Sequence, residues 1–246
     1  MQVTPDFFYP LLFVVSFFYA SVGHGGASGY LALMALFAVS PDVMKPTALL
    51  LNLFVSSSSF LQFYRGQHFR WSIFWPLAVT SIPMAFIGGL IHIEASLYKK
   101  ILGFVLLIPI VRFLFVNNPE VEKIKSSSIA MSLFLGATIG LLSGMIGIGG
   151  GIILSPILLL LCWTNQKQTA AISALFIFMN SLSGLAGQLT KGISFSQDMI
   201  FYVAVAFSGG LLGAYLGALK FPQNVLKNIL AIVLALAAYK LIFTDA

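Results

Sequence analysis

The sequence is poor in charge and rich in apolar residues. Only 8% of its 246 residues are Asp, Glu, Lys or Arg, whereas 59% are hydrophobic and the mean hydropathy is +0.99. In typical globular proteins about a quarter of the residues are charged, and they coat the water-facing surface. The composition therefore excludes a water-soluble domain and indicates that lipid is the solvent for most of the chain.

Several chemical signatures are absent as well. Cys162 is the single cysteine, which excludes an internal disulfide and a cysteine-based metal site. Neither the phosphate-binding Gly-x-x-x-x-Gly-Lys-Ser/Thr loop nor a Gly-x-Ser-x-Gly elbow occurs. Basic residues lie in short loops and form no run typical of nucleic-acid binding. The sequence therefore predicts a protein that is not an enzyme and that has no catalytic residue, no metal and no cofactor.

Long uncharged stretches predict membrane-spanning helices. No charged residue occurs between Asp6 and Asp42 or between Lys125 and Lys167. About 20 apolar residues cross the bilayer core as a helix, and helices are required because unpaired backbone amides are costly in hydrocarbon. The apolar runs cover residues 7–22, 30–39, 47–64, 71–93 and 97–116, then 129–146, 152–163, 169–189, 199–219 and 225–243. The predicted fold class is an all-α integral membrane protein, with the first run a retained helix.

An internal repeat divides the chain into two halves. Gly-His-Gly-Gly at 23–26 matches Gly-Ile-Gly-Gly at 147–150, and Asn52 lies within an apolar run as Asn180 does. The polar stretch 117–127 is the natural linker. We therefore expect a first membrane repeat over residues 1–116, a linker over 117–127 and a second repeat over 128–246. Each half would have about five helical segments.

The second run of each half is too short to cross a membrane, because ten residues of helix rise about 15 Å against a core of about 30 Å. If the glycines reverse the chain, the first two runs form a hairpin and the halves are inverted. If the two runs form one broken helix, each half has four crossings and the halves are parallel. Inversion places five of the 13 Lys and Arg residues on one face and eight on the other, whereas the parallel arrangement splits them six against seven. Because basic residues collect on the cytoplasmic side, we expect inverted repeats with both termini outside.

The two glycine breaks are candidate anion sites. A break leaves N–H groups free at the start of the next helix, where the helix dipole adds about half a positive charge. Paired breaks in two halves are typical of the midplane site of a transporter. Close helix packing is the alternative role of such glycines, and polar side chains in the runs alternatively bond to neighbouring helices. The candidate substrate-binding residues are Gly23, His24, Gly25, Gly26, Asn52, Ser56, Gln62, Gly147, Gly149, Gly150, Gly151, Asn180, Ser181, Ser183 and Gln188.

Titratable groups are scarce within the runs. His24 lies in the first break, where it either bonds a carbonyl, binds an anion or carries a proton, whereas its counterpart Ile148 is apolar. All acidic residues lie at or near run ends: Asp6, Asp42, Glu94, Glu120, Glu122, Asp198 and Asp245. A cation pump normally keeps an intramembrane carboxylate to pair with its ion. The sequence therefore predicts an anionic cargo.

At these motifs the sequence resembles the sulfite exporter TauE/SafE family. The second half carries Gly-Ile-Gly-Gly-Gly at 147–151, then Pro156 and Thr-Ala-Ala at 169–171 ahead of Asn180. The first half carries Gly-His-Gly-Gly at 23–26 and Lys-Pro-Thr-Ala at 45–48 ahead of Asn52. It departs from the pattern at Ala27 and Ala32, which stand where the third glycine and the proline would be. The resemblance covers about Tyr9 to Tyr239 and implies a permease for sulfite, organosulfonates or other small organic acids.

Together these inferences predict a secondary transporter of a small anion that works by alternating access between the two halves. Its expected partners are the anion, the bilayer and a co-transported proton or sodium ion, and its expected location is the cell inner (plasma) membrane, as a multi-pass protein. A passive anion channel and an intramembrane enzyme that uses serine and His24 are the alternatives.

Overall fold

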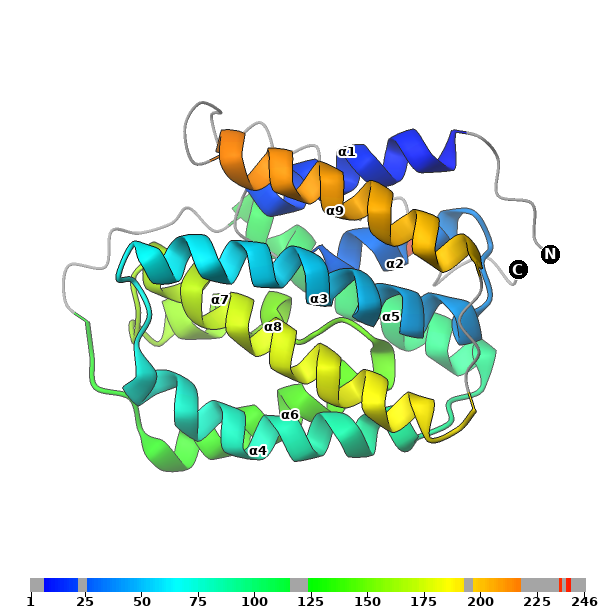
Figure 1. Ribbon diagram of the computed structural model, residues 1–246. Helices are drawn as coiled ribbons and strands as arrows, with labels where there is room; N and C mark the ends of the chain where they lie inside the picture. Colours follow the sequence, from blue (N-terminus) through cyan, green and yellow to red (C-terminus); the bar gives the residue numbers. More distant parts are fainter. Residues whose placement is uncertain are drawn as a thin grey trace.

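The computed structural model describes residues 7–21, 26–115, 124–192 and 197–217, together with Ala235, Ala238 and Tyr239. Within these residues the chain forms nine helices and no strand, which confirms the predicted all-helical fold (Figure 1). The helices are α1 (Phe8–Ser21), α2 (Ala27–Leu36), α3 (Pro41–Arg65), α4 (Trp71–Leu90), α5 (Ala95–Phe115), α6 (Ile129–Ile146), α7 (Gly151–Leu160), α8 (Gln166–Leu189) and α9 (Gln197–Gly217). The predicted run at 225–243 and linker residues 117–123 lie outside the described residues, apart from the three isolated positions in that run.

Three described segments are long and apolar enough to cross a bilayer: Trp71–Leu90, Ile129–Ile146 and Lys167–Leu189. They correspond to α4, α6 and nearly all of α8. At 25 and 21 residues, α3 and α5 are also long enough for a core of about 30 Å. The chain is thus a helical, multi-pass membrane protein. As the short second runs predict, α2 and α7 have only 10 residues each.

Local sequence explains where the two central helices begin. The apolar run starts at residue 47, but α3 begins at Pro41, because proline suits the first turn and Asp42 complements the positive end of the helix. At the start of α8, the Gln168 backbone N–H donates to Asn165 Oδ1 at 2.9 Å and the Asn165 N–H donates to Gln168 Oε1 at 3.2 Å. This reciprocal capping box fixes the first turn of α8.

Glycines allow the backbones of neighbouring helices to touch. On α6, Gly140 and Gly144 lie directly against the carbonyl oxygens of Ser81 and Ala85 in α4, so that a side chain at either glycine would clash with backbone. On α9, Gly209 and Gly213 lie in the same way against the carbonyl groups of Phe13 and Phe17 in α1. This is the small-xxx-small packing of membrane helices.

The contacts also give the directions of the helices. In α4 and α6 the contacting residue numbers rise together, as they do in α1 and α9, so each pair is parallel. The contacts between α3 and α8 pair Leu49 with Gly184 and Asn52 with Ser181, so these two helices are antiparallel. Figure 1 shows α3 and α8 crossing between the α1–α9 pair and the α4–α6 pair. The arrangement is reciprocal, because α4 packs on α6 and α8 while α9 packs on α1 and α3.

Candidate functional site

At the second glycine break, between α6 and α7, the backbone of Gly149 lies against the side chains of Asn52 and Ser181. Gly147, Gly149 and Gly150 have φ values of 88°, 71° and 78°, so the chain between α6 and α7 takes a path that other residues rarely adopt. A Cβ added at Gly149 would lie 2.7 Å from Asn52 Nδ2 and 2.9 Å from Ser181 Oγ. Both the backbone conformation and the space therefore require glycine at position 149.

Asn52 and Ser181 meet where α3 crosses α8. Both side chains are fully buried, and Asn52 Nδ2 donates to Ser181 Oγ at 3.1 Å. Asn52 Oδ1 has no hydrogen-bond partner. A buried polar atom left without a partner costs roughly 1–3 kcal/mol. Asn52 Oδ1 is therefore an acceptor that remains available beside the glycine break.

The electropositive end of α7 faces the same region of α8. Gly150 caps α7 without any side-chain hydrogen bond, so the N–H groups of the first turn have no side-chain acceptor at the cap. Gly151 packs closely against the Ile177 side chain, which a Cβ added at Gly149 would also meet, at 2.8 Å. Ile177 lies one helical turn before Ser181. The start of α7 and the Asn52–Ser181 pair therefore occupy one neighbourhood, and α7 brings partial positive charge to it.

Ser155 and Ser173 hold α7 in this position. The Ser155 hydroxyl donates to the Gly151 carbonyl at 2.8 Å and shares a second hydrogen bond of 2.8 Å with the Ser173 hydroxyl of α8. Both side chains are buried. These contacts fix the first turn of α7 against α8.

Two of the expected residues flank the pair but are partly committed to their own helices. Asn180 Nδ2 donates to the Phe176 carbonyl at 2.8 Å, while Asn180 Oδ1 is buried without a partner. The Ser56 hydroxyl donates to the Asn52 carbonyl at 2.6 Å. Such bonds to the preceding turn satisfy the side chain locally. Asn180 and Ser56 thus lie next to the Asn52–Ser181 pair, but their donor groups already bond to carbonyls of their own helices.

Other predicted residues lie elsewhere. The Ser183 hydroxyl donates to the Ile82 carbonyl at 2.6 Å, and so ties α8 to α4. Gln62 is exposed near the end of α3. Gln188 is 4% exposed, and neither of its amide atoms has a partner. It lies seven residues after Ser181, about two helical turns along α8.

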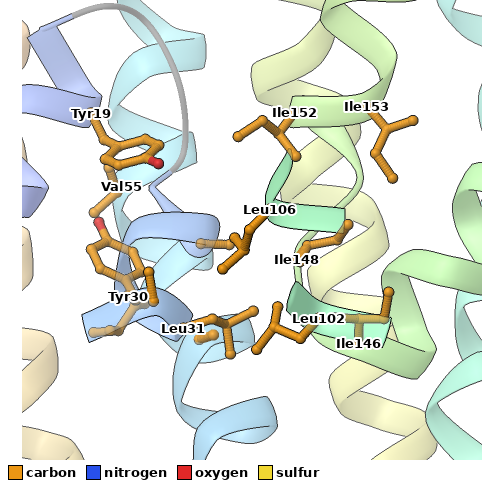
Figure 2. Close-up of a cluster of buried hydrophobic side chains, with 14 of the residues drawn as sticks. Tyr19, Tyr30, Leu31, Val55, Leu102, Leu106, Ile146, Ile148, Ile152 and Ile153 are labelled. Carbon is orange, nitrogen blue, oxygen red and sulfur yellow. The ribbon is translucent and has the colours of Figure 1, made fainter. Parts of the chain in front are cut away.

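The first break is less fully described. Gly23, His24 and Gly25 lie outside the described residues. Gly26 caps α2 with a φ of 85°, and the Tyr30 side chain folds back over it. In Figure 2, Leu31 of α2 and Leu102 and Leu106 of α5 lie between Tyr30 and Ile148, and all are buried in one apolar cluster.

Sequence reasoning missed Lys45 and Tyr98. The Lys45 ammonium lies 4.6 Å from the centre of the Tyr98 ring, and a Cβ added at Gly147 would lie 3.1 Å from both Cα and the carbonyl oxygen of Lys45. In the sequence, Lys45 enters only the count of basic residues on each face and the Lys-Pro-Thr-Ala segment of the family resemblance, and neither use indicates that it lies beside the second break. Among the described residues, no group of three or more His, Cys, Asp or Glu side chains is placed to hold a metal ion.

Comparison with known proteins agrees with these features. The family model described as "Sulfite exporter TauE/SafE" matches residues 8–241. The probable membrane transporter protein y4hK of Sinorhizobium fredii is 33% identical over 240 residues, which cover 94% of this chain and 95% of that protein. The probable membrane transporter protein YdhB of Bacillus subtilis is 26% identical over 245 residues, which cover 95% and 98%. No solved structure matches the chain. The family model and these relatives indicate a membrane transporter.

Proposed function

Because this chain belongs to the sulfite exporter TauE/SafE family, we propose that it is a secondary transporter of a small, singly charged anion such as hydrogen sulfite, an organosulfonate or a related organic acid. The anion would bind beside Gly149, between the start of α7 and the Asn52–Ser181 pair. The protein would lie in the inner (plasma) membrane and carry no enzymatic activity. One observation supports this most directly: Asn52 Oδ1 is buried without a partner beside a break that only glycine can form.

The groups of the pair match a protonated oxyanion. Ser181 accepts from Asn52, so its own proton is left to donate, and the Asn52 amide has a second N–H. The first N–H groups of α7 add further donors. Asn52 Oδ1 is an acceptor and suits an O–H on the cargo. Hydrogen sulfite offers both the oxygens and the hydroxyl that this set requires, whereas a sulfonate or carboxylate would need a hydroxyl elsewhere in the molecule to reach Asn52 Oδ1.

The charge of the cargo follows from the same groups. Asn52, Ser181, Asn180 and the α7 backbone are all neutral, and the helix end contributes only about half a unit of positive charge. A dianion would need a full counter-charge to leave water for this site. We therefore propose either a monoanion or an anion that enters together with a proton or sodium ion.

The site lies between the two halves, as alternating access requires. Asn52 belongs to the first predicted repeat, whereas Ser181 and the Gly149 break belong to the second. We propose that the halves are inverted repeats, since α3 runs antiparallel to α8 and the α4–α6 contact has its counterpart in the α9–α1 contact. Rocking one half against the other would then expose the pair to each side in turn.

Flux into liposomes tests the proposal. Purified protein should take up labelled sulfite, a small sulfonate or a small carboxylate, and the rate should saturate with concentration. Uptake should also be stimulated by the same anion on the opposite side, because a carrier returns faster when loaded. The proposal fails if no member of this panel is moved under any imposed proton, sodium or anion gradient. Non-saturating flux without exchange would indicate a channel instead.

A further inference from the structure

A lysine lies at the end of the bundle where α3 begins, beside the second break. Lys45 is half-buried, and its backbone is in contact with Gly147, the residue that ends α6. Its ammonium lies over the Tyr98 ring at 4.6 Å from the centroid. The Tyr98 hydroxyl donates to the Ile146 carbonyl at 2.9 Å, and Tyr98 is fully buried. The ring is thus fixed, and the cation–π contact holds the ammonium close to the break.

Gln188 lies at the same level of the bundle. The antiparallel contacts between α3 and α8 pair Asn52 with Ser181 and Leu49 with Gly184. One turn before Leu49 on α3 is Lys45, and one turn after Gly184 on α8 is Gln188, so these two residues lie at the same height along the two helices. Gln188 and Ser181 are two turns apart, so both side chains lie on the same face of α8.

The Gln188 side chain is left without partners. It is 4% exposed, and neither its amide oxygen nor its amide nitrogen makes a hydrogen bond. Two unpartnered polar atoms in one buried side chain are a substantial cost for a merely structural residue. The amide can instead bond to a polar molecule that passes it on the way to Ser181.

The charge near this level is positive. Asp42, one turn before Lys45 on α3, and Lys191, three residues after Gln188, both act electrostatically on Lys45. Asp42 is negative and Lys191 is positive, so these two residues and Lys45 together carry one net positive charge. The corresponding lysine of the second half, Lys167, is exposed. Lys45 thus supplies a cation next to the second break.

We infer that Lys45 and Gln188 form the approach by which the anion reaches the Asn52–Ser181 pair, with Lys45 selecting for negative charge and Gln188 receiving the anion next. A partly desolvated cation attracts anions and repels cations more strongly than one in bulk water. The inference rests on the proposed function, because it takes the Asn52–Ser181 pair as the destination.

Charged thiol reagents test the approach without requiring transport. In a Cys162→Ser background, Gln188→Cys introduces one thiol, and its reaction rate is measured in detergent with a negative and with a positive methanethiosulfonate of similar size. We expect reaction with both reagents and preference for the negative one. Lys45→Gln should lower the ratio of the two rates by about tenfold or more, because one positive charge near the thiol is removed.

Three controls make the result specific. Lys45→Arg keeps the charge and should keep the preference for the negative reagent. Lys100→Gln removes an exposed charge at the start of α5 and should also leave the rate ratio unchanged. Ser183→Cys, on the same helix but directed at the Ile82 carbonyl of α4, should show a rate ratio that does not depend on Lys45. An unreactive Gln188→Cys, or a rate ratio that Lys45→Gln does not alter, would overturn the inference.

A second measurement applies if Gln188→Cys does not fold. In otherwise native protein, Lys45→Gln should raise the KM for the transported anion about tenfold with kcat unchanged, and Lys45→Arg should restore it. An unchanged KM would overturn the inference by this route. The proposed function can fail independently of this inference. If native protein moves no anion but the ratio of the two reagent rates depends on Lys45, the approach stands and the proposed cargo is wrong.

Discussion

Asn52 of α3 and Ser181 of α8 are 129 positions apart in the sequence, yet Asn52 Nδ2 donates to Ser181 Oγ at 3.1 Å. The bond joins the two predicted repeats at the crossing of their central helices. Gly149 lies against both side chains, so the backbone of the second break completes the cluster. A ligand held here contacts both halves at once, and any relative movement of the halves changes its surroundings.

Gly149→Ala should disable the site. The new Cβ would lie 2.7 Å from Asn52 Nδ2, and the φ of 71° is unfavourable for alanine by about 1–2 kcal/mol. We expect at least a tenfold loss of anion affinity. Gly192→Ala is the matched control, since its φ is 77° but a Cβ there would meet nothing within 4 Å. Equal affinity losses in the two variants, measured by isothermal titration, would show that strain alone is responsible.

Asn52→Leu should separate binding from stability. The change removes a buried oxygen that has no partner and also the hydrogen bond from Nδ2 to Ser181 Oγ; these effects on stability oppose each other, so the melting temperature without ligand should change little. Anion affinity should fall by about tenfold to a hundredfold, because a hydrogen bond to a charged group contributes about 1.5–3 kcal/mol. Ser57→Ala, which removes a hydroxyl bonded to the Phe54 carbonyl of its own helix, should change neither quantity. A destabilised Asn52→Leu with native affinity would assign Asn52 a structural role.

Gly144→Val should open the contact between α4 and α6. Its side chain would strike the Ala85 carbonyl and the Gly89 backbone, which cannot move without shifting α4. Overpacking of this kind costs typically about 1–3 kcal/mol, so thermal unfolding in detergent should shift to lower temperature. Thr138→Val, at an exposed position of the same helix, should leave the transition in place. A native melting curve for Gly144→Val would mean that the helices are not packed at this contact.

The antiparallel course of α3 and α8 predicts which loops share a side of the membrane. Cys162 lies just before α8, and Gln67 lies just after α3. An impermeant maleimide should react with the native Cys162 from one side of the membrane. It should react from that same side with Gln67→Cys, made in a Cys162→Ser background. Thr190→Cys, after α8, should react from the opposite side. The charge distribution assigns Cys162 and Gln67 to the cytoplasm. Labelling of Cys162 and Gln67→Cys from opposite sides would contradict the inverted arrangement, whereas labelling of Cys162 and Thr190→Cys from one side would show that α8 does not cross the membrane.

The sequence indicated the helices and the break but not which side chains meet. Glycine at 147, 149 and 150 marked the interruption, and the uncharged runs marked the spans, because lipid leaves few alternatives. The seam between helices was not readable, since a membrane helix is apolar on all faces and carries no amphipathic pattern to orient it. Thus Ser181 and Ser183 looked equivalent, although one meets Asn52 and the other bonds to Ile82. Lys45 was overlooked for a related reason, because its ring partner Tyr98 is distant in the sequence.

That pair of serines gives the most direct test of the binding site. Equilibrium binding of labelled sulfite to purified protein should be measured for Ser181→Ala and Ser183→Ala, which delete the same hydroxyl two residues apart on α8. We predict that Ser181→Ala weakens binding by about tenfold or more, whereas Ser183→Ala lowers the melting temperature and leaves affinity intact. Equal affinities in the two variants and in native protein would contradict a site at the Asn52–Ser181 pair.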